Sequence, residues 1–341
     1  MGSMPGLDPQ AAVQTQWRAF PEIPAWPQLP KRSEKERMNR QGLSGLPGLS
    51  WPSAEQPLFA LSPPDLTEAL EILKNENREN RLERAAFKPE EAAGFFAFLK
   101  ESSRYISAST LAVKGQAIGP VSLGLSLTDE NGKPLLSSKA AMRVLAEYIT
   151  LHCRWQARKL AALHKPVVVF LDEPFLSSKF QPEDYGLGWG DVQGWLAGIF
   201  TALQEEGILT GLHSCGSGPW DWAFGLPVEI FHFDGFQYMN LLLENPNGLK
   251  EFIRRGGTVS WGLVPTGMVK GSFPDPAELF QIWEDAFGNL LKRGFDREEL
   301  IGRSFFSTTC GLGNCSPGVA EEAIRCLGTL VSLWRANISL R

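Results

Sequence analysis

The segment Pro166-Val-Val-Val-Phe-Leu-Asp172 decides the fold: it is a short apolar run that ends in a carboxylate and is followed by Glu173-Pro174. A run of this length, rich in β-branched residues, is typical of a strand that is buried on both faces. Six further runs of the same kind are predicted as strands: Thr110–Gln116, Val121–Leu127, Leu209–Cys215, Val228–Asp234, Thr258–Val264 and Ser304–Cys310.

Amphipathic segments lie between these runs and are predicted as helices: Pro64–Asn77, Pro89–Glu101, Lys139–Ala162, Asp191–Glu206, Asn247–Arg255, Pro276–Lys292 and Pro317–Ala336. Strands that alternate with helices indicate βαβ units and a parallel sheet. Polar residues follow most of the predicted strands, as they do at the active-site face of a (βα)8 TIM barrel. An open, doubly wound sheet is less consistent with the sequence, because no G-x-G-x-x-G motif follows the first strand.

We therefore predict a single structural domain, with a barrel body over residues 63–341 and an N-terminal segment over residues 1–62. Proline recurs through residues 17–52, which argues against a regular helix there. This Pro-rich segment is expected either to pack as a strap or to contact the substrate as a lid, and the sequence leaves both open.

Composition excludes several classes of protein. The 341 residues carry a formal net charge of −5, so nucleic acid is not expected as a partner. Five cysteines at scattered positions make a poor disulfide framework. Neither a signal peptide nor an apolar run long enough to span a bilayer is found, which predicts a cytoplasmic protein with no membrane partner.

His213-Ser-Cys215 ends one predicted strand and Cys310 ends another. Residues two apart on a strand point to the same side, so His213 and Cys215 can meet one metal ion. Imidazole and thiolate are ligands that zinc prefers, and three protein ligands leave a fourth position open, as in catalytic zinc sites. A buried histidine with two inert thiols is the alternative interpretation.

Carboxylates also follow predicted strands. Alternation lets only one of Asp172 and Glu173 point into the barrel mouth, where a carboxylate would suit a substrate ammonium group. Asp234 is a candidate metal ligand, hydrogen-bond partner of His213 or substrate contact. His232 shares the side of Asp234 on its strand, and the sequence favours a core role for it.

Eight segments, in order along the chain, carry a resemblance to a known family: Gly2-Ser-Met-Pro5, Phe20–Pro30, Gly119–Thr128, Phe170-Leu-Asp-Glu-Pro174, His213-Ser-Cys-Gly216, Phe233-Asp-Gly235, Trp261–Thr266 and Thr309-Cys-Gly-Leu-Gly313. On these segments the chain resembles the catalytic domain of cobalamin-independent methionine synthase. It is more similar to the short, single-domain relatives in the uroporphyrinogen decarboxylase/methionine synthase superfamily.

The resemblance implies zinc at the mouth of a (βα)8 barrel, with His213, Cys215 and Cys310 as its ligands. It also implies that Asp172 holds the amino group of homocysteine and that Ser3 lies near the homocysteine carboxylate. The usual first strand would then be cut short before Ser3.

Two further assignments accompany this set. Glu173, the second carboxylate of the Asp-Glu-Pro motif, is expected to contact the substrate. Asp234 is expected to have a catalytic role, because it stands where the long enzymes place a ligand Glu, although the segment between is shorter here.

Two departures from the family pattern bear on the methyl donor. The segment Trp261–Thr266 lacks the nearby histidine that the long enzymes use as general acid, and the chain has no room for their second barrel. A methyl-corrinoid, either methylcobalamin or a corrinoid protein, is therefore expected as the donor, because cleavage of its Co–CH3 bond needs no proton on the leaving group.

The resulting hypothesis is a zinc-dependent thiol S-methyltransferase that converts homocysteine to methionine. A metal-free lyase of the uroporphyrinogen decarboxylase type is a rival, with Arg32, Arg37 and Arg40 available for substrate carboxylates. A corrinoid-binding module without catalysis is the third possibility.

Overall fold

The computed structural model describes residues 2–51, 57–218, 220–269 and 271–339, and Met1 of the N-terminal motif lies outside them. Within this part of the chain, six strands form one parallel sheet and two short strands, β1 (Leu49–Ser50) and β2 (Leu58–Phe59), form an antiparallel pair. The parallel strands are β3 (Val113–Ile118), β4 (Val167–Asp172), β5 (Leu209–Ser214), β6 (Ile230–Asp234), β7 (Thr258–Val264) and β8 (Ser304–Thr308).

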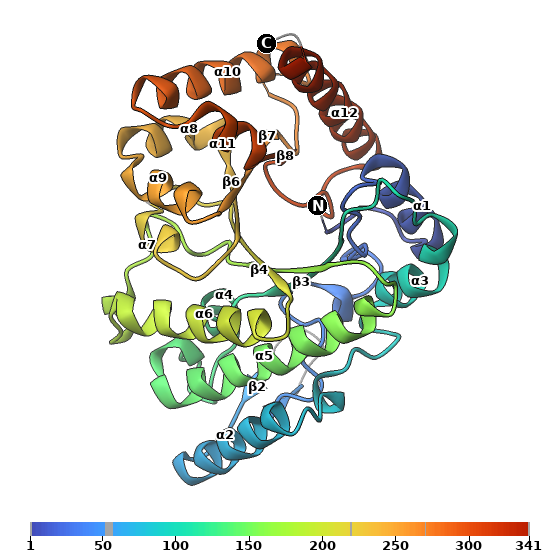
Figure 1. Cartoon of the computed structure of the whole chain (residues 1–341). Helices are drawn as coiled ribbons and strands as arrows, with labels where there is room; N and C mark the ends of the chain where they lie inside the picture. Colours follow the sequence, from blue (N-terminus) through green and yellow to red (C-terminus); the bar gives the residue numbers. More distant parts are fainter. Residues whose placement is uncertain (1, 52–56, 219, 270, 340–341) are drawn as a thin grey trace.

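Helices surround these strands (Figure 1). In the described residues they are α1 (Pro9–Ala19), α2 (Pro63–Arg78), α3 (Ala93–Glu101), α4 (Pro120–Ser126), α5 (Lys139–Ala161), α6 (Trp189–Gln204), α7 (Asp221–Phe224), α8 (Gly235–Glu244), α9 (Asn247–Arg254), α10 (Pro276–Lys292), α11 (Arg297–Gly302) and α12 (Pro317–Ser339).

The order of strands in the parallel sheet is the order in the chain, β3-β4-β5-β6-β7-β8. The prediction of a parallel α/β fold is therefore confirmed. Six of the seven predicted strands form, with bounds that differ by a few residues at most, and the seven predicted helices are all present. The strands formed because their apolar runs are buried on both faces, as in β6, where every residue is buried.

The prediction of a strand over Val121–Leu127 is wrong, because this segment forms α4. Its apolar residues alternate as in a strand, but Pro120 occupies the first turn, where its fixed φ favours a helix. In addition, the Glu173 carboxylate accepts hydrogen bonds from the backbone N–H groups of Val121 and Ser122, at 2.9 and 2.8 Å. A distant residue thus satisfies the free donors of the helix, which periodicity alone cannot indicate.

Four helices, α1, α7, α8 and α11, were not predicted. Two of them have clear starting signals: Asp8 accepts from the N–H of Gln10 ahead of Pro9, and Asp296 accepts from the N–H of Glu299. The helix α8 begins directly after β6, so Asp234 ends the strand and also caps the helix. These four helices have only four to eleven residues, and elements so short are difficult to identify by periodicity.

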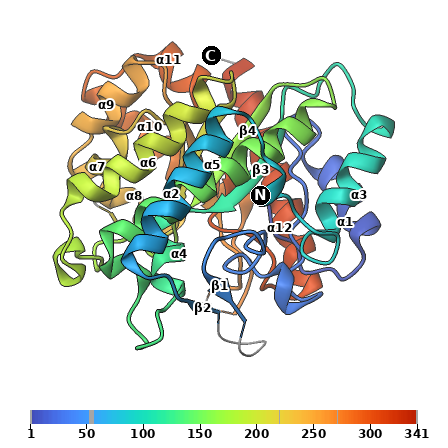
Figure 2. The same ribbon diagram turned by 90° about the horizontal axis from the view of Figure 1, so that it is seen from below.

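The N-terminal segment runs alongside β3 and packs as a strap. Ala25, Trp26 and Leu29 are fully buried, and Ala25 makes a parallel bridge to Lys114 of β3. Gln28 pairs in turn with Ser3, so the start of the chain lies beside the strands in both views (Figures 1 and 2).

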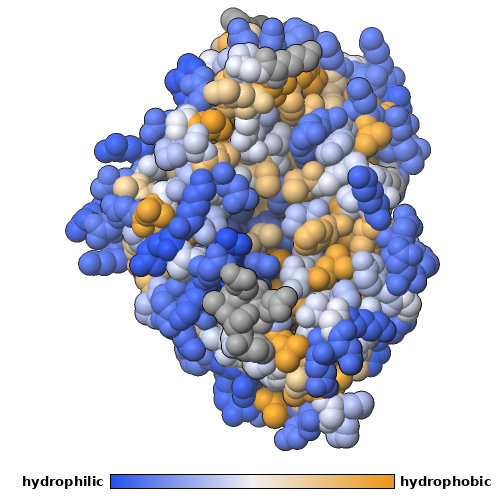
Figure 3. Space-filling model, turned by 180° about the vertical axis from the view of Figure 1, so that it is seen from behind, coloured by the Kyte–Doolittle hydropathy of each residue, from blue (hydrophilic) through white to orange (hydrophobic). Residues whose placement is uncertain are grey.

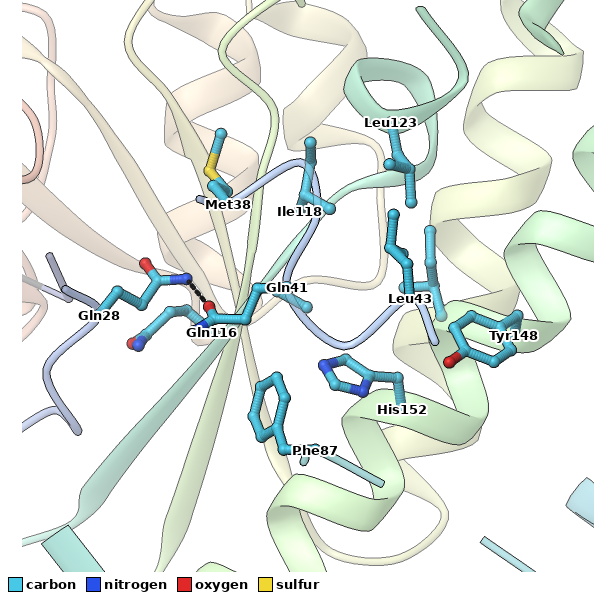
Figure 4. A pocket seen from close by; sticks show the side chains of 12 residues that line it. Gln28, Met38, Gln41, Leu43, Phe87, Gln116, Ile118, Leu123, Tyr148 and His152 are labelled. Carbon is cyan, nitrogen blue, oxygen red and sulfur yellow. Dashed lines mark hydrogen bonds between the residues drawn. The ribbon is translucent and has the colours of Figure 1, made fainter. Parts of the chain in front are cut away.

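Buried glutamines hold the strap in place (Figure 4). The side-chain amide of Gln28 donates to Gln41 at 2.8 Å, and Gln41 donates to the backbone carbonyl of Glu91. The indole of Trp26 donates to Gln156 of α5 at 3.1 Å. Because buried amides without partners are costly, this network fixes the strap against β3 and α5.

The surface has one large hollow on the face opposite Figure 1, near the middle of the molecule, with hydrophilic and hydrophobic residues mixed around it (Figure 3). None of the helices in the described residues combines the length and the apolar character needed to cross a membrane.

Candidate metal centre

The carboxyl ends of the parallel strands gather the predicted site residues. Asp172 is the last residue of β4 and pairs in register with His213 of β5. Cys215 follows β5 by one residue, and Cys310 follows β8 by two. All four side chains line one cavity of about 1690 Å³.

His213, Cys215 and Cys310 form a group whose ligand atoms all lie within 4.8 Å of one another. The Sγ atom of Cys310 lies 3.9 Å from Nε2 of His213. Tetrahedral zinc, with Zn–S of about 2.3 Å and Zn–N of about 2.0 Å, requires its ligand atoms to be about 3.5–3.8 Å apart. The spacing and the ligand types therefore fit a zinc ion with small adjustments.

The two thiols lie in different electrostatic environments. The pKa of Cys310 is lowered, because the Cys215 thiol donates to it and His213 lies beside it. The pKa of Cys215 is raised by the same contact and by burial. One thiolate is thus already favoured at Cys310, and a divalent cation between the sulfurs would favour ionisation of both.

His232 of β6 orients His213. Nε2 of His232 lies 3.0 Å from the backbone carbonyl of Thr308, which can only accept, so Nε2 carries the proton. Nδ1 of His232 is then an acceptor and receives a hydrogen bond from Nδ1 of His213 at 2.5 Å. The remaining nitrogen of His213, Nε2, lies on the side of the thiols. Against the lowering effect of burial, the neighbouring Cys310 raises the pKa of His213, so a metal ion at Nε2 would displace a proton.

The surroundings keep His232 in this neutral form. Burial, followed by the neighbouring His213, lowers the pKa of His232 well below its ordinary value. The two rings stack with their centroids 4.5 Å apart. Gly262 of β7 leaves room for this arrangement, because a Cβ atom there would lie 3.1 Å from Nε2 of His232. A residue that the sequence assigned to the core is thus the hydrogen-bond partner of a candidate metal ligand.

Ser3 reaches the same cavity from the start of the chain. Its backbone carbonyl accepts from the N–H of Leu312, and its hydroxyl accepts from the N–H of Gly313 at 3.1 Å. A Cβ atom on Gly311 would lie 2.2 Å from the Ser3 hydroxyl, so this glycine allows the close approach. The structure therefore brings Ser3 beside Cys310.

Asp172 faces the cavity and is half-buried. Burial raises the pKa of its carboxyl, while the charges of Lys114 and His213 act in the opposite direction. A carboxylate in such a place has a strong requirement for a cationic partner. Asp172 is thus placed where it could receive an ammonium group.

Glu173 does not face the cavity. Its side chain is fully buried and caps α4, and the hydroxyl of Ser122 also donates to it at 2.6 Å. This placement differs from the expected substrate contact, because strand alternation turns Glu173 away from Asp172.

Asp234 lies near the centre but outside the ligand group. Its two oxygens accept from the backbone N–H and the side-chain amide of Gln237, at 2.9 and 2.7 Å. It caps α8 and is not among the residues that line the cavity. The geometry therefore connects Asp234 to the helix rather than to a ligand in the cavity.

Lys114 is the cavity residue that sequence reasoning missed. It is the second residue of β3 and is half-buried. The signal was present, because a lysine within a run predicted to be buried on both faces is unusual. Trp220, five residues after Cys215, is buried against Phe233, with ring centroids 5.0 Å apart.

We predict that Cys215→Ser and Cys310→Ser each reduce zinc to well below one ion per chain, because either change removes one of three protein ligands. Elemental analysis of the purified variants gives the stoichiometry. Cys326→Ser is the matched control, since Cys326 is buried in α12 and away from the centre. Full zinc occupancy in either ligand variant would show that the ligand set is wrong.

Loss of the His232 ring is expected to weaken zinc binding about 10- to 100-fold, because His213 loses the acceptor that fixes its tautomer. Chelator competition would measure this in His232→Ala, with a thermal melt to check folding. His232→Asn keeps an acceptor and should recover part of the affinity. Equal zinc affinity in all three proteins would contradict the orienting role.

Comparisons with known proteins add no assignment of their own. No protein-family model matches the sequence, and no curated protein is significantly similar to it. The resemblance carried by the eight segments therefore stays a prediction, and the contacts within the cavity provide the main support for a function.

Proposed function

We propose that the parallel sheet belongs to a (βα)8 barrel. The identity of spatial and chain order across six parallel strands supports this fold. The N-terminal segment supplies further pairing around the ring, because Ala25 bridges to β3 and Ser3 bridges to Gln28. The backbone N–H of Leu312, which follows β8, donates to the backbone carbonyl of Ser3, so the N-terminal segment is bonded both to β3 and to the segment after β8.

We propose further that the protein is a zinc-dependent thiol S-methyltransferase with homocysteine as acceptor. The observation that carries this proposal is the convergence of one imidazole and two thiols beside a half-buried carboxylate in a large cavity. When bound to His213, Cys215 and Cys310, zinc would lower the pKa of an acceptor thiol and so supply a thiolate near neutral pH.

The protein side chains orient the acceptor. Asp172 receives its ammonium group, since this half-buried carboxylate faces the cavity. Ser3 directs its hydroxyl group toward the substrate carboxylate while accepting from Gly313. Holding the amino acid at both groups fixes the sulfur in one position for in-line attack.

The donor we propose is a methyl-corrinoid. The cavity of about 1690 Å³ is far larger than homocysteine requires. Both histidines that line it are occupied with each other, and His232 also donates to Thr308, so neither is free to protonate a leaving group. Transfer from methylcobalamin needs no such proton: the acceptor sulfur forms a bond to the methyl carbon, and the electron pair of the C–Co bond stays on cobalt.

The contacts of the arginines favour this proposal over the lyase. Arg32 is paired with Glu36, and both Arg37 and Arg40 are paired with Glu34. A site for a tetrapyrrole with many carboxylates would need these cations for the substrate.

Incubation of the zinc-loaded protein with methylcobalamin and homocysteine should yield methionine, which mass spectrometry detects. Cys310→Ser should give none, and methyltetrahydrofolate should not replace the corrinoid. Binding of methylcobalamin without any methionine would contradict the transferase and support the binding module.

A further inference from the structure

The ammonium group of Lys114 has a polar partner but no described carboxylate in salt-bridge contact. Its Nζ atom donates to Oε1 of Gln116 at 3.1 Å, and no ion pair joins it to a described carboxylate. It lines the same cavity as Asp172, His213 and Cys310. A half-buried cation that faces a cavity without an ion-pair partner is suited to binding an anionic group.

Neighbouring residues hold Lys114 in one position. Its Nζ atom lies 4.5 Å from the ring centroid of Phe170, a cation–π contact. A Cβ atom on Gly211 would lie 2.5 Å from the Phe170 ring, so this glycine makes space for it. The amide of Gln116 donates to the backbone carbonyl of Trp26 at 3.0 Å, which turns its oxygen toward Lys114.

The position of Lys114 matches the length of an α-amino acid. Phe170 and Asp172 lie on the same side of β4, two residues and about 7 Å apart along the strand. The cation over Phe170 therefore lies one strand repeat below the carboxylate, and Asp172 pairs in register with the metal ligand His213. A cation and an anion at this spacing suit the carboxylate and the ammonium group of one amino acid.

Charge balance supports a ligand with both signs of charge. Zinc with the two protein thiolates has no net charge. Asp172 and Lys114 are then the negative and positive charges that remain to meet the ammonium and carboxylate groups of the ligand. Burial lowers the pKa of Lys114 to about 8, against the opposing effect of the Asp172 charge. Ser3 is neutral and cannot compensate the charge of a carboxylate.

We infer that Lys114 binds the α-carboxylate of the acceptor, so that Lys114 and Asp172 together select zwitterionic amino-acid thiols. This inference rests on the proposed function, because it uses the same cavity and a thiol at the metal centre. Lys114 determines specificity in this arrangement and does not take part in methyl transfer.

Calorimetric binding of three thiols to the zinc-loaded protein, without any methyl donor, tests the inference. The thiols are L-homocysteine, 3-aminopropane-1-thiol, which lacks the carboxylate, and 4-mercaptobutanoate, which lacks the ammonium group. Lys114→Met should weaken the binding of homocysteine and of 4-mercaptobutanoate about 10- to 100-fold and leave the binding of 3-aminopropane-1-thiol unchanged. Asp172→Asn should instead weaken the binding of homocysteine and of 3-aminopropane-1-thiol.

Lys31→Met is the matched control, because Lys31 lines the same cavity but donates to the backbone carbonyl of Cys315. Its affinities for all three thiols should be those of the unchanged protein. Equal effects of Lys114→Met on the three thiols, or no effect on any, would overturn the inference while leaving the proposed function intact. Failure of the unchanged protein to bind any thiol would overturn both.

Discussion

The register of three neighbouring strands is the constraint on which the site depends. Asp172 of β4 pairs with His213 of β5, and His213 pairs with His232 of β6. A slip of one residue in either pairing would turn these side chains to the opposite face of the sheet. Backbone hydrogen bonds between the strands therefore fix the relative positions of Asp172, the candidate metal ligand His213 and its hydrogen-bond partner His232.

Charge inside the cavity follows from this arrangement. Thiols, imidazoles, a carboxylate and a lysine would each be costly to bury alone, but together they form a set that one divalent cation and one zwitterion can balance. Burial and the hydrogen bond from His232 to Thr308 fit a neutral His232 ring, and its Nδ1 atom accepts from His213. Under the proposed function, such a site would bind its ligands by charge compensation, and the remaining space in the cavity would be left to the donor.

Much of the fold could be predicted because buried strands and amphipathic helices have distinct periods. The segment Val121–Leu127 could not, since its helix depends on Glu173, which lies about fifty residues later in the chain. The metal ligands were accessible from residue type and position at strand ends. The contacts of His232 and Glu173 could not be predicted, because they depend on which neighbour each side chain meets in the fold. The place of Lys114 in the cavity could not be predicted without knowing to which side of β3 its side chain points.

Zinc-edge X-ray absorption on the purified protein, with and without homocysteine, tests the central claim most directly. The account predicts about one zinc ion per chain bound by one nitrogen and two sulfur atoms from the protein, with one additional sulfur when homocysteine is present. A sulfur count that does not change on addition of homocysteine, or a protein that takes up no zinc, would contradict it.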